Sequence, residues 1–336
     1  MSRAPRIGVT LGDPAGIGPE IVVKAWQALR ETGPAFFVIG DAQAIASAPG
    51  AGRAPVRPIS GLDTVTAAFR SGVPVLDLPL RSAVVAGQPD PAAAPSIIQW
   101  IETAVGLALS RTVAGVVTAP IAKAPLYAAG FKFPGHTEFL GELTSAATYD
   151  GARGPIMMLT AADLHATLVT VHEPLAKVSA KLSIEAVVNA GLVTAQAMRR
   201  DFGIAAPRIA VAGLNPHAGE SGAIGREEVE IVQPAVRALK DLGVDARGPY
   251  PADTLFPAEV RATYDAAVCL YHDQALIPVK MLDFWGGVNV TLGLPIVRTS
   301  PDHGTAFDIA GRGLARADSL IAAIRLADQI ARRRAG

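Results

Sequence analysis

The chain has 336 residues, of which 50% are hydrophobic and 18% charged, and this length suits two domains or one large α/β unit with a sizeable buried core. Thirty basic and thirty acidic side chains give a formal net charge of +0, which excludes a general electrostatic attraction to nucleic acid or to an anionic membrane. The amino terminus runs directly into a strand-like segment and no run of 18 apolar residues occurs, so we expect a soluble, cytoplasmic protein.

The first third of the chain alternates strand-like and helical segments. A glycine-rich turn, GDPAGIGPE at residues 12–20, leads from the first predicted strand into the first predicted helix. The turn has neither G-x-G-x-x-G spacing nor a P-loop lysine, so a tight turn explains it at least as well as nucleotide binding does. The predicted strands are residues 6–11, 35–39 and 114–118, and the predicted helices are residues 19–30 and 96–110.

A loop that enters a helix at residues 133–140 is a candidate anion site. Its sequence, FPGHTEFL, places His136 and Thr137 at the beginning of the helix. The unpaired N–H groups and partial positive charge of a helix amino terminus favour phosphate or carboxylate. An ordinary N-cap threonine is the alternative interpretation of the same segment.

The remainder of the chain continues the alternation. The predicted strands are residues 156–159, 166–171, 208–214 and 266–270, the predicted helices are residues 184–201 and 226–242, and residues 287–298 read as a strand and a turn. Strands that alternate with helices predict a mostly parallel α/β fold rather than an all-helical or sandwich fold.

Three histidines each follow an apolar, strand-like segment: His172, His217 and His272. Taken singly, each is better explained as a hydrogen-bonded loop residue. Together they indicate one metal, because ligands gather beyond the carboxyl ends of strands in α/β sheets and three imidazoles match the open site of a catalytic ion.

Other side chains near the third histidine could take part in binding or catalysis. Asp253, which lies between prolines, is a candidate proton acceptor, with a helix N-cap as the alternative. Lys280, Asn289 and Arg298 could hold an anionic group. The one cysteine, Cys269, lies in the apolar run before His272, and we expect it to pack in the core rather than to act as a nucleophile or ligand.

Six segments together carry a resemblance to a known family. In order along the chain they are GDPAGIGPE, FPGHTEFL, NPHAGE, GPYPADTLF, YHDQALIPVK and GVNVTLGLP followed by RTSPDHGTAFDIAG. They resemble the 4-hydroxythreonine-4-phosphate dehydrogenase family of pyridoxal phosphate biosynthesis, and the resemblance runs from residue 7 to about residue 330.

This resemblance implies a two-lobed α/β fold similar to isopropylmalate and isocitrate dehydrogenases, with the active site in the interlobe cleft. Residues 1–130 with 290–336 would form a terminal lobe, and residues 131–289 a central lobe that carries most metal and substrate ligands and the contacts of a homodimer with shared active sites. The divalent metal, zinc, magnesium or cobalt, would be bound by His172, His217 and His272, with ligands from both subunits. The phosphorylated substrate would be bound by His136, Thr137, Lys280, Asn289 and Arg298.

The resemblance also implies a nucleotide site in HGTAFDIAG, which is similar to the adenosine-binding loop of the isopropylmalate relatives. The cofactor residues would be His303, Gly304, Thr305, Ala306 and Asp308. A carboxylate at Asp308 would accept hydrogen bonds from ribose hydroxyls and repel a 2′-phosphate, so NAD is expected in preference to NADP.

The reaction implied is the oxidation of 4-phosphooxy-L-threonine to 2-amino-3-oxo-4-phosphooxybutanoate, which loses carbon dioxide to give 3-amino-2-oxopropyl phosphate. Asp253 and Lys280 are the expected catalytic residues, and Asp253, or a water that it orients, would take the proton. One alternative is a related dehydrogenase of a cis-dihydrodiol dicarboxylate. Others are a metal-dependent aldolase or hydrolase of a phosphorylated metabolite and a protein that binds a metabolite without catalysis.

Overall fold

The computed structural model describes residues 7–335, which divide into two compact units. Unit 1 contains the residues up to Ala147 together with those from Pro295 onward, and unit 2 is Thr148–Leu294. The boundaries expected from the sequence were residues 130 and 289, so the loop and helix around His136 fall in unit 1 rather than in the central unit. The reason is local, because that helix contacts α4 of unit 1.

Unit 1 is built on a parallel sheet. Its strands follow the order β3-β4-β2-β1-β5-β12, and neighbouring strands in this order are parallel. The strands are β1 Ile7–Thr10, β2 Phe36–Gly40, β3 Val56–Pro58, β4 Val73–Asp77, β5 Gly115–Thr118 and β12 Arg298–Pro301. Its helices are α1 Gly18–Leu29, α2 Ala42–Ala46, α3 Val65–Ser71, α4 Ala94–Leu109, α5 Lys123–Ala128, α6 His136–Leu143 and α13 Asp318–Ala335, with short 3-10 turns η1 Ala51–Arg53, η2 Leu62–Thr64 and η3 Pro91–Ala93.

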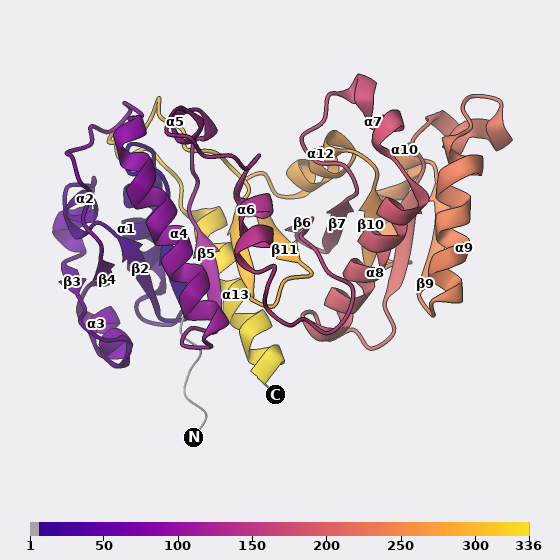
Figure 1. Ribbon diagram of the computed structural model, residues 1–336. Coiled ribbons are helices and arrows are strands. Elements are labelled where there is room, and N and C mark those ends of the chain that lie inside the picture. The colour runs from indigo at the N-terminus through magenta and orange to yellow at the C-terminus, as the bar shows by residue number, and fades with distance from the viewer. Residues whose placement is uncertain (1–6, 336) are drawn as a thin grey trace. The chain divides into compact units, whose positions relative to one another are not determined.

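Helix α4 shows why this part of the sequence folds as it does. Its buried side chains recur at the three- and four-residue spacing of one helical face. The helix contacts β1, β2 and β5, and Figure 1 shows α4 lying across the strands of unit 1. Trp100 is fully buried and donates its indole N–H to the carbonyl of Leu78 at 3.0 Å. The stretch Pro91–Leu109 is long and apolar enough to cross a membrane, but half of it is buried inside the unit, as in the core helix of a globular domain.

Unit 2 has a mixed sheet with strand order β11-β6-β7-β10-β8-β9. Strands β7, β10, β8 and β9 are parallel neighbours, whereas β11–β6 and β6–β7 are antiparallel. The strands are β6 Ile156–Ala161, β7 Leu164–Leu168, β8 Arg208–Ala212, β9 Asp245–Tyr250, β10 Ala266–Cys269 and β11 Val288–Leu292. The helices are α7 Leu175–Lys181, α8 Ile184–Arg200, α9 Gln233–Asp241, α10 Ala252–Leu255, α11 Ala258–Arg261 and α12 His272–Leu282, with η4 Pro216–Gly222 and the π-helical turn η5 Glu228–Val232.

The predicted α/β class is therefore confirmed. Strands β3, β4 and β9 are additional to the predicted elements, and one predicted strand lies elsewhere. The strand predicted at residues 166–171 instead spans Leu164–Leu168, because a two-residue turn folds it back on β6 and the hairpin pairs Ala161 with Leu164. Ala162 of that turn has φ 51°, and alternation of apolar residues alone does not reveal such a turn.

Cys269 packs in the core of unit 2, as predicted. It is fully buried on β10, within an apolar cluster that includes Leu168 and Val279. Burial raises the pKa of its thiol to about 12, so the side chain is a neutral apolar group at pH 7.

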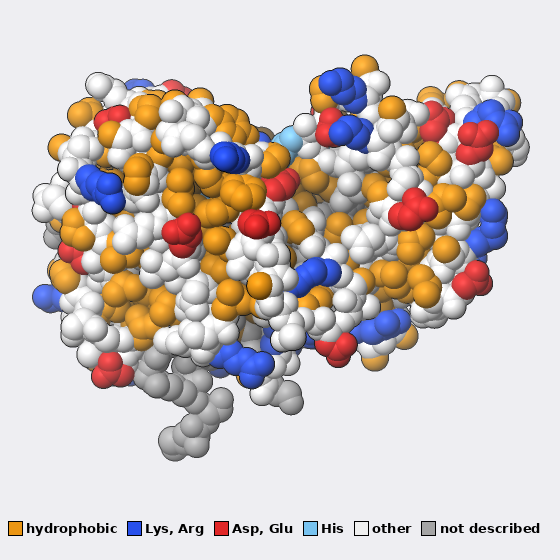
Figure 2. Space-filling view, viewed as in Figure 1, with side chains coloured by type: hydrophobic (Ala, Val, Ile, Leu, Met, Phe, Trp, Pro, Cys, Tyr) orange, Lys and Arg blue, Asp and Glu red, His pale blue; other side chains and the backbone are white. Residues whose placement is uncertain are grey.

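On the face shown in Figure 2, basic and acidic side chains are scattered over both units and form no large patch of one sign. This distribution agrees with the balance of thirty basic and thirty acidic residues in the sequence.

Candidate active site

The three histidines of the predicted metal site follow neighbouring strands of unit 2. His172, His272 and His217 come after β7, β10 and β8, which lie side by side in parallel. Parallel strands end at the same edge of a sheet, so the topology brings the three loops to one edge. The rings of His172 and His272 are 5.8 Å apart between centroids.

The imidazoles are not gathered into a finished metal site within this single chain. No group of three His, Cys, Asp or Glu side chains in residues 7–335 is arranged to hold an ion. The donor set nevertheless suits a divalent cation, because three imidazoles with a position left for substrate are characteristic of catalytic sites.

His272 has the partner that an oriented imidazole ligand needs. It is the first residue of α12, and its Nδ1 lies 2.7 Å from a carboxylate oxygen of Asp273. When Nδ1–H donates to that carboxylate, the lone pair of Nε2 is available to a metal, which is the usual role of such a pair.

His217 lies in an unusual backbone segment. His217, Ala218, Glu220 and Ser221 have φ between 43° and 55°, and Gly219 and Gly222 are also in the left-handed region. Each left-handed residue that carries a side chain costs roughly 1–2 kcal/mol. Contacts elsewhere in the unit must offset this cost, and strain of this kind is often found at functional sites.

Unit 1 contains the anion side of the predicted site. His136 and Thr137 are the first two residues of α6, and Arg298 begins β12. Arg298 is 2% exposed and donates from Nη2 and Nε to the hydroxyl oxygen of Thr118 at 2.6 and 3.2 Å. Burial lowers the pKa of Arg298, and the negative charge of Glu138 opposes that effect.

The electrostatics of His136 follow from its position. Burial, and then the positive charge of Arg298, hold the pKa of His136 well below its usual value of 6.5, so the ring is neutral at pH 7. Its buried Nε2 has no hydrogen-bond partner within residues 7–335. A neutral imidazole with an unsatisfied buried nitrogen is suited to donate a hydrogen bond to an anionic ligand.

Lys123 is a cation near this position that the sequence analysis did not single out. It is the first residue of α5, and a Cβ built on Gly135, the N-cap of α6, would lie 3.8 Å from its Nζ. The available signal was a lysine soon after the end of β5, but the contact with Gly135 depends on how α5 and α6 fold.

Lys280 and Asn289 belong to unit 2. Lys280 lies two turns after His272 on α12, with Nζ 5.2 Å from the ring centroid of Phe284. Asn289 is half-buried on β11, and its Oδ1 has no hydrogen-bond partner in the described part of the chain.

Asp253 is exposed on the short helix α10, which contacts η4, the turn that contains His217. The N-cap of this helix is Pro251, so the alternative interpretation of Asp253 as an N-cap is wrong. The carboxylate is free to meet solvent or substrate beside the His217 turn.

The predicted cofactor loop, residues 303–311, rests on the glycine-rich turn after β1. Ile17 donates its backbone N–H to the carbonyl of Thr305 at 3.0 Å, and a Cβ on Gly16 would lie 2.9 Å from the same oxygen. The turn at residues 12–20 thus supports the loop closely. Asp308 is exposed, and the buried Nε2 of His303 has no hydrogen-bond partner within residues 7–335.

An ion pair between Glu20 and Lys24, called the clamp below, holds the segment just after this loop. Glu20, 1% exposed on α1, accepts from Ala315 N at 2.9 Å and Gly313 N at 3.2 Å. Lys24, one turn later, donates to Glu20 at 2.8 Å and to the carbonyls of Gly313 and Ala315 at 2.9 and 2.5 Å. The pair ties helix α1 to the segment that follows the cofactor loop.

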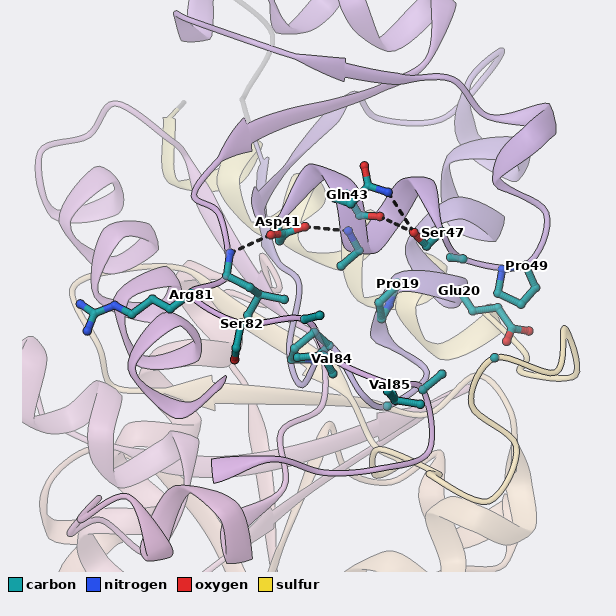
Figure 3. Close-up of a pocket in the computed structure, with 18 residues that line it drawn as sticks. Pro19, Glu20, Asp41, Gln43, Ser47, Pro49, Arg81, Ser82, Val84 and Val85 are labelled. Carbon is teal, nitrogen blue, oxygen red and sulfur yellow. Dashed lines mark hydrogen bonds between the residues drawn. The ribbon is translucent and has the colours of Figure 1, made fainter. Parts of the chain in front are cut away.

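A cavity of about 670 Å³ lies in unit 1 beside the same elements. Its lining comes from the segments after β1, β2 and β4 and from Gly311, whereas the five predicted cofactor residues lie outside the lining. Figure 3 shows Asp41 joining two walls, since its carboxylate accepts from Ala44 N at 2.6 Å and Leu80 N at 2.7 Å. The volume is in the range of small-molecule and cofactor sites.

The chain thus has two α/β units, one with His136 and Thr137 at a helix amino terminus beside a buried arginine, and one with three histidines that follow adjacent parallel strands. Such an arrangement is typical of α/β enzymes that act on small polar molecules. Residues 33–327 match the family described as pyridoxal phosphate biosynthetic protein PdxA. The chain belongs to this family, as its motifs predicted.

Individual relatives agree with the assignment. The chain is 67% identical over 328 residues, 98% of each chain, to a protein of Caulobacter vibrioides named 4-hydroxythreonine-4-phosphate dehydrogenase. It is similar to the crystal structure of the protein of that name from Klebsiella pneumoniae, with 40% identity, a TM-score of 0.83 and coverage of 97% of this chain and 99% of the other. A terephthalate 1,2-cis-dihydrodiol dehydrogenase from Burkholderia xenovorans is 30% identical with a TM-score of 0.64, over 97% and 98%. The prediction of an enzyme of the dehydrogenase class is confirmed by these relatives.

Proposed function

We propose that the protein oxidises 4-phosphooxy-L-threonine with NAD in a reaction that depends on a divalent metal. The observation that carries the proposal is the placement of His172, His217 and His272 at the carboxyl ends of three adjacent parallel strands, in a chain 67% identical to a relative named for this activity. The product, 2-amino-3-oxo-4-phosphooxybutanoate, is a β-keto acid that decarboxylates to 3-amino-2-oxopropyl phosphate because its ketone accepts the electron pair.

His172, His217 and His272 would hold the cation, which we expect to be zinc, magnesium or cobalt. A bound cation of this kind lowers the pKa of a coordinated hydroxyl and stabilises negative charge on oxygen. The carboxylate of Asp273 would orient His272 and fix its tautomer. Ligands from two subunits would complete each site.

The phosphate group would be held by His136, Thr137, Lys280, Asn289 and Arg298. Arg298 is positioned by Thr118 and carries the buried positive charge. Neutral His136 would donate its Nε2–H, and the Thr137 hydroxyl and the helix amino terminus would add uncharged donors. These groups fix the anionic end of the substrate and so orient the hydroxyl that is oxidised.

Proton transfer is assigned to Asp253, directly or through a water that it orients, with Lys280 as the second catalytic residue. The support for Asp253 is its exposed position on a helix that contacts the His217 turn. An accepting carboxylate is required because removal of hydride from the alcohol carbon also releases the hydroxyl proton.

NAD would bind at His303, Gly304, Thr305, Ala306 and Asp308. The exposed carboxylate of Asp308 favours the ribose hydroxyls of NAD and repels the 2′-phosphate of NADP. The adjoining cavity, which shares Gly311 with this loop, offers room for part of the dinucleotide.

The protein would act as a homodimer in the cytoplasm. Helix α12 and the turn after it expose four apolar side chains, Ile277, Met281, Phe284 and Trp285, by 51 to 81%. Exposed apolar clusters of this kind mark interaction surfaces. Their location on the helix that starts with His272 would couple dimer formation to the active site.

A second candidate function is the oxidation of a cis-dihydrodiol dicarboxylate. It is favoured by the similarity to the Burkholderia xenovorans dihydrodiol dehydrogenase, and a carboxylate would then occupy the phosphate position. A metal-dependent aldolase or hydrolase would use the histidines without any need for NAD.

An NADH-formation assay separates these functions. Purified protein is given 4-phosphooxy-L-threonine or a dihydrodiol dicarboxylate, each with and without a chelator. We expect NADH only with the phosphorylated alcohol and its loss on chelation. NADH from the dihydrodiol alone would establish the second function, and no NADH with either substrate would exclude both dehydrogenase functions.

A variant tests the metal assignment separately. His217→Ala should abolish metal-dependent turnover, because an imidazole ligand is lost, while NAD affinity measured by fluorescence titration stays unchanged. Unchanged turnover would remove His217 from the metal site.

A further inference from the structure

We propose that Glu228 is a positioning residue that holds the His217 loop, residues 213–222, in the conformation from which His217 reaches the metal. The inference rests on the metal function proposed above. Glu228 is 0% exposed in the first turn of η5, and its carboxylate is directed at the beginning of this loop.

The carboxylate satisfies the loop's backbone and side-chain donors together. Leu214 N and Asn215 N donate to one oxygen at 2.8 and 2.7 Å, and Asn215 Nδ2 donates to the other at 2.9 Å. An ionised carboxylate is the strongest acceptor that a side chain can offer to such donors. The loop therefore begins from a fixed point two residues before His217.

Glycines allow the close approach of this carboxylate. A Cβ on Gly219 would lie 2.5 Å from one Glu228 oxygen, and a Cβ on Gly213 would lie 3.3 Å from the other. Gly213, before the left-handed segment, and Gly219, within it, thus both lie against the same buried carboxylate. The contact explains how a run of positive φ angles from His217 to Gly222 persists in the folded protein.

A second buried side chain ties this loop to the next histidine. Gln274, 5% exposed on α12, donates to the carbonyl of Gly213 at 2.7 Å and accepts from Leu270 N at 2.7 Å. Gly213 begins the His217 loop, and Leu270 directly follows β10, the strand that leads to His272. Gln274 sets the spacing between the two loops, and Glu228 sets the internal shape of the first.

Glu228→Gln tests the proposal, because it preserves the size of the side chain but removes the charge. Glu230→Gln is the matched control, since Glu230 lies in the same helical turn but is exposed and bonds only to Arg226 in the described hydrogen-bond network. The readouts are the Kd for Co²⁺ by calorimetry, the visible absorption of the Co²⁺ complex, the Kd for NAD, and amide hydrogen exchange at Leu214 and Asn215.

We expect Glu228→Gln to raise the Kd for Co²⁺ roughly tenfold or more, as loss of outer-shell support commonly does. Its Co²⁺ spectrum should change, the exchange of both amides should accelerate, and NAD affinity should stay the same. The control should match the wild type in all four. A merely structural role for Glu228 would lower thermal stability and leave the Co²⁺ spectrum of the folded variant unchanged.

The outcomes separate this inference from the proposed function. If the wild type binds Co²⁺ and Glu228→Gln binds it equally with the same spectrum, the positioning role is overturned and the metal function stands. If the wild type binds no Co²⁺, the metal function fails and the positioning role fails with it. If Glu228→Gln does not fold, slow exchange of the Leu214 and Asn215 amides in the wild type supports the proposal, and fast exchange overturns it.

Discussion

Arg298 carries a positive charge and is nevertheless buried in unit 1. A guanidinium that is 2% exposed is costly to desolvate, and here it is directed by Thr118 toward the amino terminus of α6, where its charge also lowers the pKa of His136. The anionic substrate group proposed above would offset this cost on binding.

Arg298→Ala should weaken binding of the phosphorylated substrate by about 2 kcal/mol or more, the range for truncating one partner of a buried charged pair. The measurement is the KM of each substrate, and the KM for NAD should not change. Arg298→Lys should have an intermediate KM, because lysine keeps the positive charge but lacks the planar guanidinium group with its paired donors. Arg316→Ala, at an exposed ion pair with Asp318, is the control, and equal KM values for all three variants would contradict the assignment.

The buried side chain of His165 predicts how the stability of the fold depends on pH. Burial lowers its pKa to about 4, despite opposing effects of Asp163 and Asp265, and its ring packs on Phe202 with centroids 4.7 Å apart. The unfolded chain has the ordinary value of 6.5, so between about pH 6.5 and 4 the unfolded state takes up a proton that the folded state does not. Stability is lost as pH falls through that window, by roughly 2 kcal/mol at pH 5.

Urea unfolding of the wild type and His165→Phe at pH 7.5 and pH 5 measures this effect. The variant keeps an aromatic ring on Phe202 but cannot titrate, so its loss of stability between the two pH values should be smaller by about that amount. An imidazole that titrates near 6.5 by NMR would contradict the prediction.

At the scale of elements, the glycine-rich turn after β1 contacts a segment far along the chain. The glycine-rich turn after β1 is read from the sequence as either a tight turn or a ligand loop, and in the fold it supports the backbone of the cofactor loop at Thr305. Helix α1 extends this support, because Glu20 and Lys24 bind residues 313–315. These contacts join segments nearly 300 positions apart in the chain, so spacing within either segment could not reveal them.

Glu20→Gln should raise the KM for NAD roughly tenfold, about 1.4 kcal/mol, because the clamp loses its buried charge and one acceptor. The KM for the phosphorylated substrate should stay the same. Glu31→Gln, at an exposed pair with Arg30 just beyond the same helix, is the control. An unchanged NAD affinity in Glu20→Gln would show that the cofactor does not depend on this loop.

For the whole molecule, the exposed apolar side chains of α12 lead to a prediction about assembly. Met281 is 81% exposed and Ile277 63% exposed, one turn apart on α12. Met281→Glu should convert a homodimer to monomers in sedimentation velocity, since burying an unpaired carboxylate in an apolar interface costs several kcal/mol. Turnover should fall with dimer content if active sites are shared.

Leu242→Glu is the matched control for that experiment, because Leu242 is 58% exposed just beyond the end of α9 in the same unit. This variant should keep the dimer and its turnover. A dimer that survives Met281→Glu would place the subunit interface elsewhere.

The sequence by itself determined the α/β class, the family, the burial of Cys269 and the identity of three histidines at strand ends. These features depend on local apolar patterning and on residues that keep their order along the chain. A prediction was wrong where strand pairing decides the outcome, as in the β6–β7 hairpin.

Only the tertiary structure decided which side chains support the site. It revealed that β7, β10 and β8 are neighbours and that Glu228 and Gln274 bond to the segments before the histidines. It also revealed that Glu20 and Lys24 bond to Gly313 and Ala315, just after the predicted cofactor loop. The physical reason is that the supporting role of a buried carboxylate or amide lies in its hydrogen bonds to backbone groups. Those groups come together only when distant segments of the chain fold against each other.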